Sequence, residues 1–334
     1  MLQLARLVLI ALWSVGIASL AGAQPASGTS VATADTAPGR LQWYDLGVYG
    51  RFGYTQPGVL QSVRNAPRTI GRTVMQAVQR DQLDSWAVVM ASTAATIAAD
   101  EWLLDRTRLL ARHVGLPPNH PSVNVRLGGL KLVPVPTTIG SAIYFLGDGA
   151  VSLGVAGGFL AVGAWTDDHR ATRTASQITE SLLAAGTFTQ ILKHLTGRQT
   201  PSESTQPRGK WNWFPSWSEY NDNVPGHDAF PSGHLAVATA TVEVIAQNYP
   251  EHHLVRPVGY TLLTALSFAM VNNGVHWASD YPLAIALGKS VANVAVRGGR
   301  VRDDRRDERR AQLHPFIGPG RLGVSLAFGD AGVR

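Results

Sequence analysis

The sequence predicts an all-α protein, a helical bundle with about six core helices. Apolar stretches of about 14–20 residues alternate with polar loops, and alanine, leucine and glycine dominate these stretches. No sustained alternation of period two, the mark of half-buried strands, interrupts them. The predicted helices lie near residues 86–104, 137–146, 149–166, 177–195, 233–248, 257–273 and 281–297.

Composition narrows the class of protein. The chain has 334 residues, of which 45% are hydrophobic and 16% charged, and it contains no cysteine. This apolar content excludes disorder over the whole chain, and the lack of cysteine excludes disulfides, thiolate metal sites and cysteine nucleophiles. Half of the net charge of +6 lies in the arginine-rich stretch 297–310. We therefore expect no nucleic-acid partner.

The N-terminus has the pattern of an export signal. Arg6 precedes the apolar run from Leu7 to Leu20, and the small residues Ala21-Gly22-Ala23 follow. Residues 1–23 are therefore predicted to be a signal peptide, with an uncleaved first membrane helix as the alternative. Cleavage would place the mature protein in the periplasm or the cell-envelope membrane.

The rest of the chain divides into three regions. Residues 24–85 are an N-terminal leader and a poorly defined region, with short strands expected within 41–54. Residues 86–298 form the helical domain, whose motif core is 177–298. Residues 299–334 are an arginine-rich tail with a short strand expected near 321–328.

Two environments fit the helices. Only 149–166 and 257–275 lack charges over about 18 residues, which is close to the length of a membrane span. Other helices carry Glu180, Lys193, Glu243 and Lys289. With a cleaved signal and a cytoplasmic tail, a membrane-embedded bundle needs a further span at 132–147. A bundle that is soluble or bound to the membrane surface does not, and both alternatives stay open.

The clearest chemical motif is Phe230-Pro231-Ser232-Gly233-His234, which precedes an apolar helix. Ser232 fits an N-cap, so the backbone N–H groups of Gly233 and His234 would face an anion at the helix N-terminus. His234 would bring a proton to the same place. The plainer interpretation is a helix cap with a surface histidine.

Two further pieces flank this motif. Asp280 follows His276 by four residues, and such a carboxylate can hold Nδ1–H and leave Nε2 as a nucleophile. Lys193 and Arg198 lie around the end of an apolar helix that Gly197 is expected to terminate. Taken separately, these residues are explained equally well by a loop histidine, an N-cap and cations that favour a helix C-terminus.

Together the three pieces resemble the type 2 phosphatidic acid phosphatase / vanadium haloperoxidase superfamily. Its pattern is K-x6-R-P, P-S-G-H and S-R-x5-H-x3-D, and the resemblance covers about 145–298. It implies an acid phosphatase/haloperoxidase-like bundle in which His276, oriented by Asp280, is the nucleophile and His234 the general acid. It further implies that Lys193, Arg198, Ser232 and Gly233 bind phosphate, with no cofactor and no metal.

The sequence departs from this pattern at two arginines. Thr200 stands where the family has the arginine before proline, and Ala269-Met270 stands where it has Ser-Arg. We expect Arg198 to replace the first arginine, because its long side chain can span an offset of two residues. Arg208, Lys210 and His227, in the long connection 196–231, are further candidates.

The resemblance implies a phosphatase that acts on a phosphomonoester or pyrophosphate through a phosphohistidine, and we expect the substrate to be a phosphorylated lipid. The alternatives are a soluble periplasmic nonspecific acid phosphatase acting on small-molecule phosphates, and a non-catalytic phosphate- or lipid-binding protein. Vanadate-dependent peroxidase chemistry, with His276 as ligand, is a remoter one. Trp211, Trp213, Phe214 and Trp217 suit a membrane interface or loop packing equally. Asp167-Asp168-His169 fits a helix connection better than a metal site.

Overall fold

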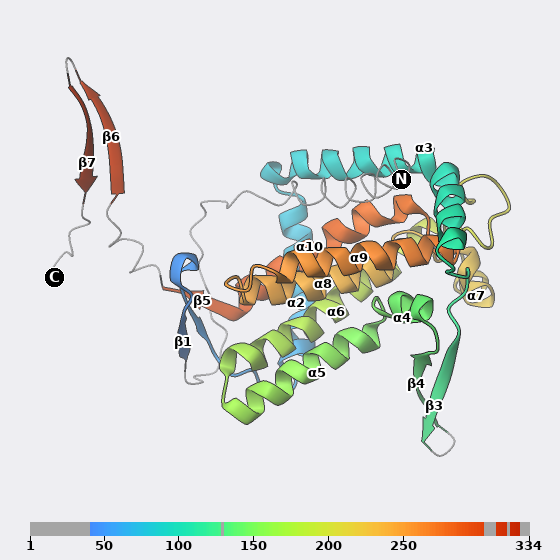
Figure 1. The fold of residues 1–334 in the computed structure, drawn as a ribbon, viewed down its shortest axis with the longest axis horizontal. Coiled ribbons are helices and arrows are strands. Elements are labelled where there is room, and N and C mark those ends of the chain that lie inside the picture. Colours follow the sequence, from blue (N-terminus) through green and yellow to red (C-terminus); the bar gives the residue numbers. More distant parts are fainter. Residues whose placement is uncertain (1–40, 128–129, 304–311, 319–320, 328–334) are drawn as a thin grey trace.

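The computed structural model describes residues 41–127, 130–303, 312–318 and 321–327, with side chains for 41–123 and 135–303. The predicted signal peptide 1–23 and much of the arginine-rich tail lie outside the described residues. The described chain is mostly helical, which confirms the predicted all-α bundle (Figure 1). Its helices are α2 (Gln61–Ala77), α3 (Leu83–His113), α4 (Ile139–Phe145), α5 (Gly149–Thr166), α6 (His169–Thr196), α7 (Trp217–Asp222), α8 (Gly233–Asn248), α9 (Val255–Asn272) and α10 (Tyr281–Gly299).

Helices α6, α8 and α10 form the centre of the bundle. They pack against one another, while α5 and α2 cover α6, and α9 and α3 cover the other side (Figure 1). One apolar cluster joins α3, α8, α9 and α10 around Leu235, Leu266 and Ile285, each of which is buried. A second joins α5, α6, α8 and α10 around Ile178 and Val244. These two clusters fix the helix ends that carry the sequence motifs.

The described chain also contains short antiparallel strands. β1 (Gln42–Asp45) pairs antiparallel with β2 (Arg51–Tyr54), which pairs with β5 (Arg300–Arg302). The expected strands within 41–54 are thus present, and they join the start of the described chain to the residues that follow α10. β3 (Ser122–Leu127) pairs with β4 (Leu130–Pro136), and β6 (Gln312–Gly318) pairs with β7 (Arg321–Ala327), which coincides with the strand expected near 321–328. Helix α2 lies in the region predicted to be poorly defined, and it packs on α6 and α10.

Local caps define the helix ends nearest the motifs. The Ser232 hydroxyl accepts from the Leu235 N–H at 3.4 Å and starts α8. Gly197 ends α6 with a positive φ of 51°. A Cβ on Gly197 would lie 2.0 Å from the carbonyl oxygen of Asn212, so only glycine lets the long connection pack over this helix end.

The charges inside the helices have structural partners. Glu243 of α8 accepts from Arg256 at 3.1 Å and from the Tyr260 hydroxyl at 2.9 Å, both on α9. Burial alone would raise the pKa of Glu243, but the hydrogen bonds and the charge of Arg256, with smaller contributions from Tyr260 and Lys289, lower it. Glu180 of α6 accepts from Thr69 of α2, and burial raises its pKa. These ionisable groups are therefore accounted for within the bundle.

Two helices are long and apolar enough to cross a membrane, namely Gly149–Thr166 and the continuous stretch Arg80–His113. The first was expected. Residues 257–275 do not meet this criterion in the part of the chain that the structure describes. The further span considered at 132–147 is wrong, since this stretch holds the end of β4 and the short helix α4.

Candidate active site

The structure brings the three sequence pieces together. The C-terminal end of α6 supplies Lys193, the N-terminus of α8 supplies Ser232, Gly233 and His234, and the turn η4 (Ala278–Asp280) before α10 follows His276. The backbone N–H of Ser232 donates to the carbonyl oxygen of Asp280 at 3.2 Å, which ties the second piece to the third. The Thr196 hydroxyl donates to the carbonyl oxygen of Phe230 at 3.0 Å, which ties the first to the second.

His276 is buried and its ring is held from one side. Nδ1 lies 2.8 Å from the carbonyl oxygen of Ala229 and 3.3 Å from Oδ2 of Asp280. Both partners are acceptors, so Nδ1 carries the proton and Nε2 keeps its lone pair. The same Oδ2 accepts from the backbone N–H of Trp277 at 2.8 Å, and Asp280 is fully buried. His276 is thus presented as a nitrogen nucleophile in a fixed orientation.

The first turn of α8 offers backbone donors. The N–H groups of Gly233 and His234 precede the point at which helix carbonyls can accept them, so they are available to an anion. Lys193 Nζ lies 3.7 Å from the position that a Cβ on Gly233 would occupy, which places the ammonium group beside this turn. Ser232 differs from the prediction, because its N–H and hydroxyl already serve Asp280 and the helix cap.

His234 faces His276 across this space. Their ring centroids are 6.4 Å apart, and the Tyr144 ring of α4 lies 5.1 Å from His234 on another side. A Cβ on Gly147 would lie 2.6 Å from Cβ of His234, so the turn between α4 and α5 approaches closely. Burial, together with the charges of His276 and Lys193, lowers the pKa of His234 to about 4. The free site therefore holds His234 as a neutral imidazole at pH 7.

Arg198 occupies a different place from the one predicted. Its side chain is fully buried and stacks between Trp211 and Trp277, at 4.9 and 5.3 Å from the ring centroids. Nη1 donates to Asp280 Oδ1 and the Ser279 hydroxyl, both at 2.6 Å. Nη2 donates to Asp100 Oδ2 at 2.7 Å and to the Arg208 carbonyl oxygen at 2.8 Å, and Nε donates to the same carbonyl at 3.3 Å.

A guanidinium group has five N–H donors, and these contacts use all five. Arg198 therefore has no donor left for a phosphate, and the prediction that it replaces the missing arginine as a ligand does not fit this geometry. Instead Arg198 holds Asp280, which in turn holds His276. Sequence reasoning could not have found this, because Asp100 lies 98 residues away in α3.

Other side chains occupy the positions of the family arginines. The Thr200 hydroxyl lies 3.0 Å from the Ser202 hydroxyl, and Met270 is buried with its sulfur 3.7 Å from the Ser232 hydroxyl. Of the other candidates, Arg208 and Lys210 are exposed on the long connection. His227 is buried, and its Nδ1 has no hydrogen-bond partner in the described structure. None of the three is seen in contact with His234 or His276.

Asp228 is a site residue that sequence reasoning missed. Its Oδ2 lies 2.8 Å from Lys193 Nζ, and its other carboxylate oxygen accepts from the Tyr220 hydroxyl. The next residue, Ala229, supplies the carbonyl oxygen that holds His276. The only sequence signal was its place two residues before Phe230-Pro231.

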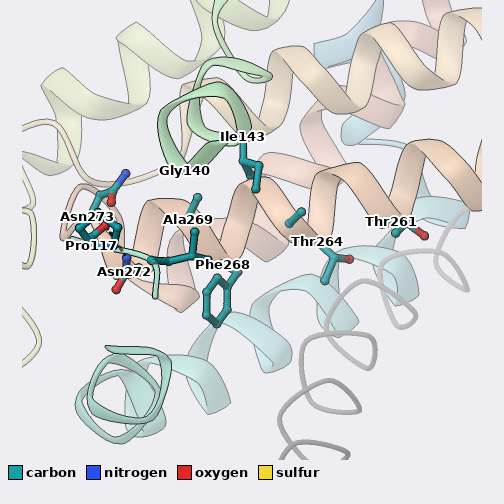
Figure 2. Close-up of a pocket in the computed structure, with 11 residues that line it drawn as sticks. Pro117, Gly140, Ile143, Thr261, Thr264, Phe268, Ala269, Asn272 and Asn273 are labelled. Carbon is teal, nitrogen blue, oxygen red and sulfur yellow. Dashed lines mark hydrogen bonds between the residues drawn. The ribbon is translucent and has the colours of Figure 1, made fainter. Parts of the chain in front are cut away.

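An apolar pocket of about 500 Å³ lies beside the site, between α4, α9 and the turn after α3 (Figure 2). Ile143 and Ala269 line it, and each is followed in the chain by a residue of the site, Tyr144 and Met270. The long connection contributes exposed aromatic side chains at Trp213, Phe214 and Trp217, whereas Trp211 packs on Arg198. Loop packing thus holds for Trp211, and the membrane interface stays a prediction for the exposed rings.

The connection Asp167-Asp168-His169 is a helix junction, as predicted. Asp167 ends α5 and Asp168 caps α6 by accepting from the Ala171 N–H at 3.0 Å. Within the described residues, no group of three or more histidine, aspartate or glutamate side chains is arranged to bind a metal ion.

Comparison with known proteins identifies a related family. The family model of the PAP2 superfamily matches residues 175–303, a segment that runs from the first turns of α6 to the end of β5 and contains every motif residue. The match covers less than half of the chain. It confirms the resemblance drawn from the three motifs. No curated protein and no solved structure matches the chain.

Proposed function

Because residues 175–303 match the family model of the PAP2 superfamily, we propose that the protein hydrolyses a phosphate ester or pyrophosphate through a phosphohistidine on His276. The observation that carries this proposal is the pair of acceptors on His276 Nδ1, Ala229 O and Asp280 Oδ2, which leave Nε2 directed away from them with its lone pair. This orientation leaves Nε2 as the ring nitrogen that can attack phosphorus.

The proposed reaction has two steps. The N–H groups of Gly233 and His234 and the Lys193 ammonium hold the phosphoryl oxygens, and Nε2 of His276 attacks phosphorus. A P–N bond forms, the P–O bond to the leaving group breaks, and His234 gives that oxygen a proton. Water then attacks phosphorus, returns a proton to His234 and releases phosphate from His276.

The low pKa of His234 fits this scheme only when substrate is bound. A phosphoryl anion next to the imidazole favours its charged form, so the general acid acquires its proton together with the substrate. We therefore place the function of His234 in the complex.

We further propose a lipid substrate and an exported enzyme with its active site on the periplasmic side. The pocket beside the site has the volume and the apolar lining that a hydrocarbon chain requires. Helix α5 exposes Leu160, Val162 and Trp165, at 53, 57 and 91% of their surface, which favours contact with a membrane. A soluble nonspecific acid phosphatase is the alternative if soluble phosphates are hydrolysed equally well.

A specific observation favours a second candidate, a non-catalytic phosphate-binding protein. All five donors of Arg198 are engaged within the protein, and Thr200 and Met270 offer no positive charge. Each charge-assisted hydrogen bond lost without replacement removes about 1.5–3 kcal/mol from phosphate binding.

The test is phosphate release from a panel of lipid and soluble phosphates by wild type and His276→Ala. We expect His276→Ala to lower kcat/KM by at least about 10³-fold, because no other group can form the intermediate. Rapid quenching in base after mixing with radiolabelled substrate should leave a covalent label on wild type alone.

His252→Ala is the matched control, because His252 is exposed in the loop between α8 and α9. It should retain wild-type activity and labelling. Hydrolysis at wild-type rates by His276→Ala would overturn the nucleophile. Binding of phosphate without any hydrolysis by wild type would establish the non-catalytic candidate.

A further inference from the structure

The space between His276 and His234 carries little net positive charge. Lys193 is the cation that the described structure places beside the first turn of α8, and its ammonium lies 2.8 Å from the Asp228 carboxylate. Arg198 is neutralised by Asp100 and Asp280 and has no donor to spare. Thr200 and Met270 are uncharged. A site that takes a phosphate dianion is ordinarily lined by several cations, and this one pairs its lysine with an acid.

Asp228 acts on the site itself and not only on Lys193. Its charge raises the pKa of His234, as does that of Asp148 in the turn between α4 and α5, while Lys193 and His276 lower it. About a quarter of the Asp228 side chain is exposed, at 27%. The Tyr220 hydroxyl of α7 donates to it and holds it in place. Asp228 thus places a fixed negative charge within electrostatic reach of any bound phosphoryl group.

We propose that this site selects a phosphoryl group that carries one negative charge, and that Asp228 is the residue that sets this selectivity. A bound dianion interacts with the single ammonium group of Lys193 and is repelled by at least one facing carboxylate, that of Asp228. A bound monoanion is repelled less, so Lys193 can pair with the monoanion and with Asp228 at the same time. The substrates with this charge are phosphodiesters at any ordinary pH and phosphomonoesters that keep one acidic proton. The inference rests on the proposed function and narrows its substrate class.

The same reaction scheme accommodates a diester with all bonds balanced. Nε2 of His276 forms the P–N bond, the bond to one alkoxide breaks, and His234 protonates that alkoxide. Water then cleaves the P–N bond and returns a proton to His234. The product is a phosphomonoester, whose phosphate group loses its second proton with a pKa of about 6. Asp228 then disfavours the doubly charged product, which assists its release.

The experiment compares two substrates with the same leaving group at pH 7.5. Methyl 4-nitrophenyl phosphate carries one charge, and 4-nitrophenyl phosphate carries two. Their intrinsic reactivities differ, so the measured quantity is the change in the ratio of their kcat/KM values between wild type and Asp228→Asn. The amide keeps the size of the carboxylate and can still accept from Tyr220.

We expect Asp228→Asn to raise kcat/KM for the doubly charged ester by about tenfold relative to the singly charged one. Asp222→Asn is the matched control, since Asp222 is exposed at the end of α7 and its loss changes the net charge equally. It should leave the ratio within about twofold of wild type. An unchanged ratio in Asp228→Asn, or one that moves equally in Asp222→Asn, overturns the inference.

A second variant and a second measurement keep the test decisive. Tyr220→Phe removes a donor from Asp228 and should move the ratio in the opposite direction, even if Asp228→Asn does not fold. Titration calorimetry at pH 7.5 with inorganic phosphate and dimethyl phosphate measures the same selectivity without turnover. Tighter phosphate binding by Asp228→Asn in a protein that hydrolyses neither ester would support the inference and reject the proposed function. Hydrolysis of the esters, together with a ratio of phosphate to dimethyl phosphate affinity that Asp228→Asn leaves unchanged, would support the proposed function and reject the inference.

Discussion

His234 shows how a single residue depends on its surroundings for its protonation. Half-buried between Tyr144 and the turn at Gly147, and facing Lys193 and His276, it has a pKa of about 4. At pH 5 the free imidazole is therefore mostly neutral, and the general acid lacks its proton. A bound anion reverses the balance, because it stabilises the imidazolium.

Binding of an anion should therefore take up a proton. We expect dimethyl phosphate, which itself has no proton to exchange, to bind with a net uptake of up to about one proton per site at pH 5. Calorimetric titrations in two buffers of different ionisation enthalpy measure this number.

If His234 is the group that takes up the proton, a substitution of His234 should abolish the proton uptake. His234→Gln should bind without proton uptake, whereas His252→Gln, in an exposed loop, should behave as wild type. Equal uptake by His234→Gln would show that another group in the site is the one that titrates.

Arg198 marks the limit of residue-by-residue prediction. Its position in the motif gave a reasonable expectation of a phosphate ligand, because spacing alone shows which side chains are near the site. The acceptors that fill its donors come from α3, from η4 and from the Arg208 backbone. Whether an arginine in a site faces the ligand or the protein depends on such partners, which are not adjacent in sequence.

At the scale of elements, α3 completes a site that otherwise lies within residues 175–303. Asp100 of α3 is buried and accepts from the Ser279 N–H at 3.0 Å, from the Ser279 hydroxyl at 2.5 Å and from Arg198 at 2.7 Å. Through these contacts α3 fixes η4, and η4 carries Asp280. The turn between α9 and α10 is therefore held by a helix outside the family segment.

We expect Asp100→Asn to destabilise the protein by about 3 kcal/mol, because it removes one of the two carboxylates that pair with Arg198 and turns an amide donor towards the donors of Arg198 and Ser279. Chemical denaturation measures the free energy of unfolding. Among folded molecules kcat should fall more than KM rises, since Asp100 positions the nucleophile and does not touch substrate.

Asp105→Asn is the control on the same helix, because Asp105 is exposed. Its effect on the free energy of unfolding should stay within about 0.5 kcal/mol. Equal stabilities of the Asp100→Asn and Asp105→Asn proteins would show that the Asp100–Arg198 contact contributes nothing to the fold.

At the scale of the whole molecule, the apolar surface that α5 exposes is the feature that favours contact with a membrane. Helix α5 covers α6 with one face (Figure 1). Only 17% of its 18 residues are buried, so most of this apolar helix is accessible. The ion pairs of Glu243 and the contacts of Glu180 lie inside the bundle, so they do not oppose contact between α5 and a membrane.

We expect the double variant Val162→Glu/Trp165→Glu to lose binding to vesicles of mixed anionic and neutral phospholipids, because these exposed residues are three apart and it places two charges on one side of α5. Co-sedimentation with the vesicles measures the bound fraction. Val59→Glu is the control, since Val59 is 99% exposed in the loop before α2. Wild-type protein that stays in the supernatant would favour the soluble alternative.

The sequence by itself determined the helical class, most helix positions and the identity of the three motifs. Helix α5 lies at 149–166 and α8 at 233–248, where they were expected, because caps such as Asp148 and Ser232 and long apolar runs act locally. The histidine and aspartate pair of the third motif was equally readable, since four residues separate its members.

Only the tertiary structure decided how the charges are paired. It placed Arg198 against Asp100 and Asp280, and Lys193 against Asp228. The physical reason is that a buried charge takes whichever partner the packing of distant helices brings to it. Helix α2 was not predicted for a related reason. Its contacts with α6, such as the hydrogen bond from Thr69 to Glu180, join residues that are far apart in sequence and form only in the folded bundle.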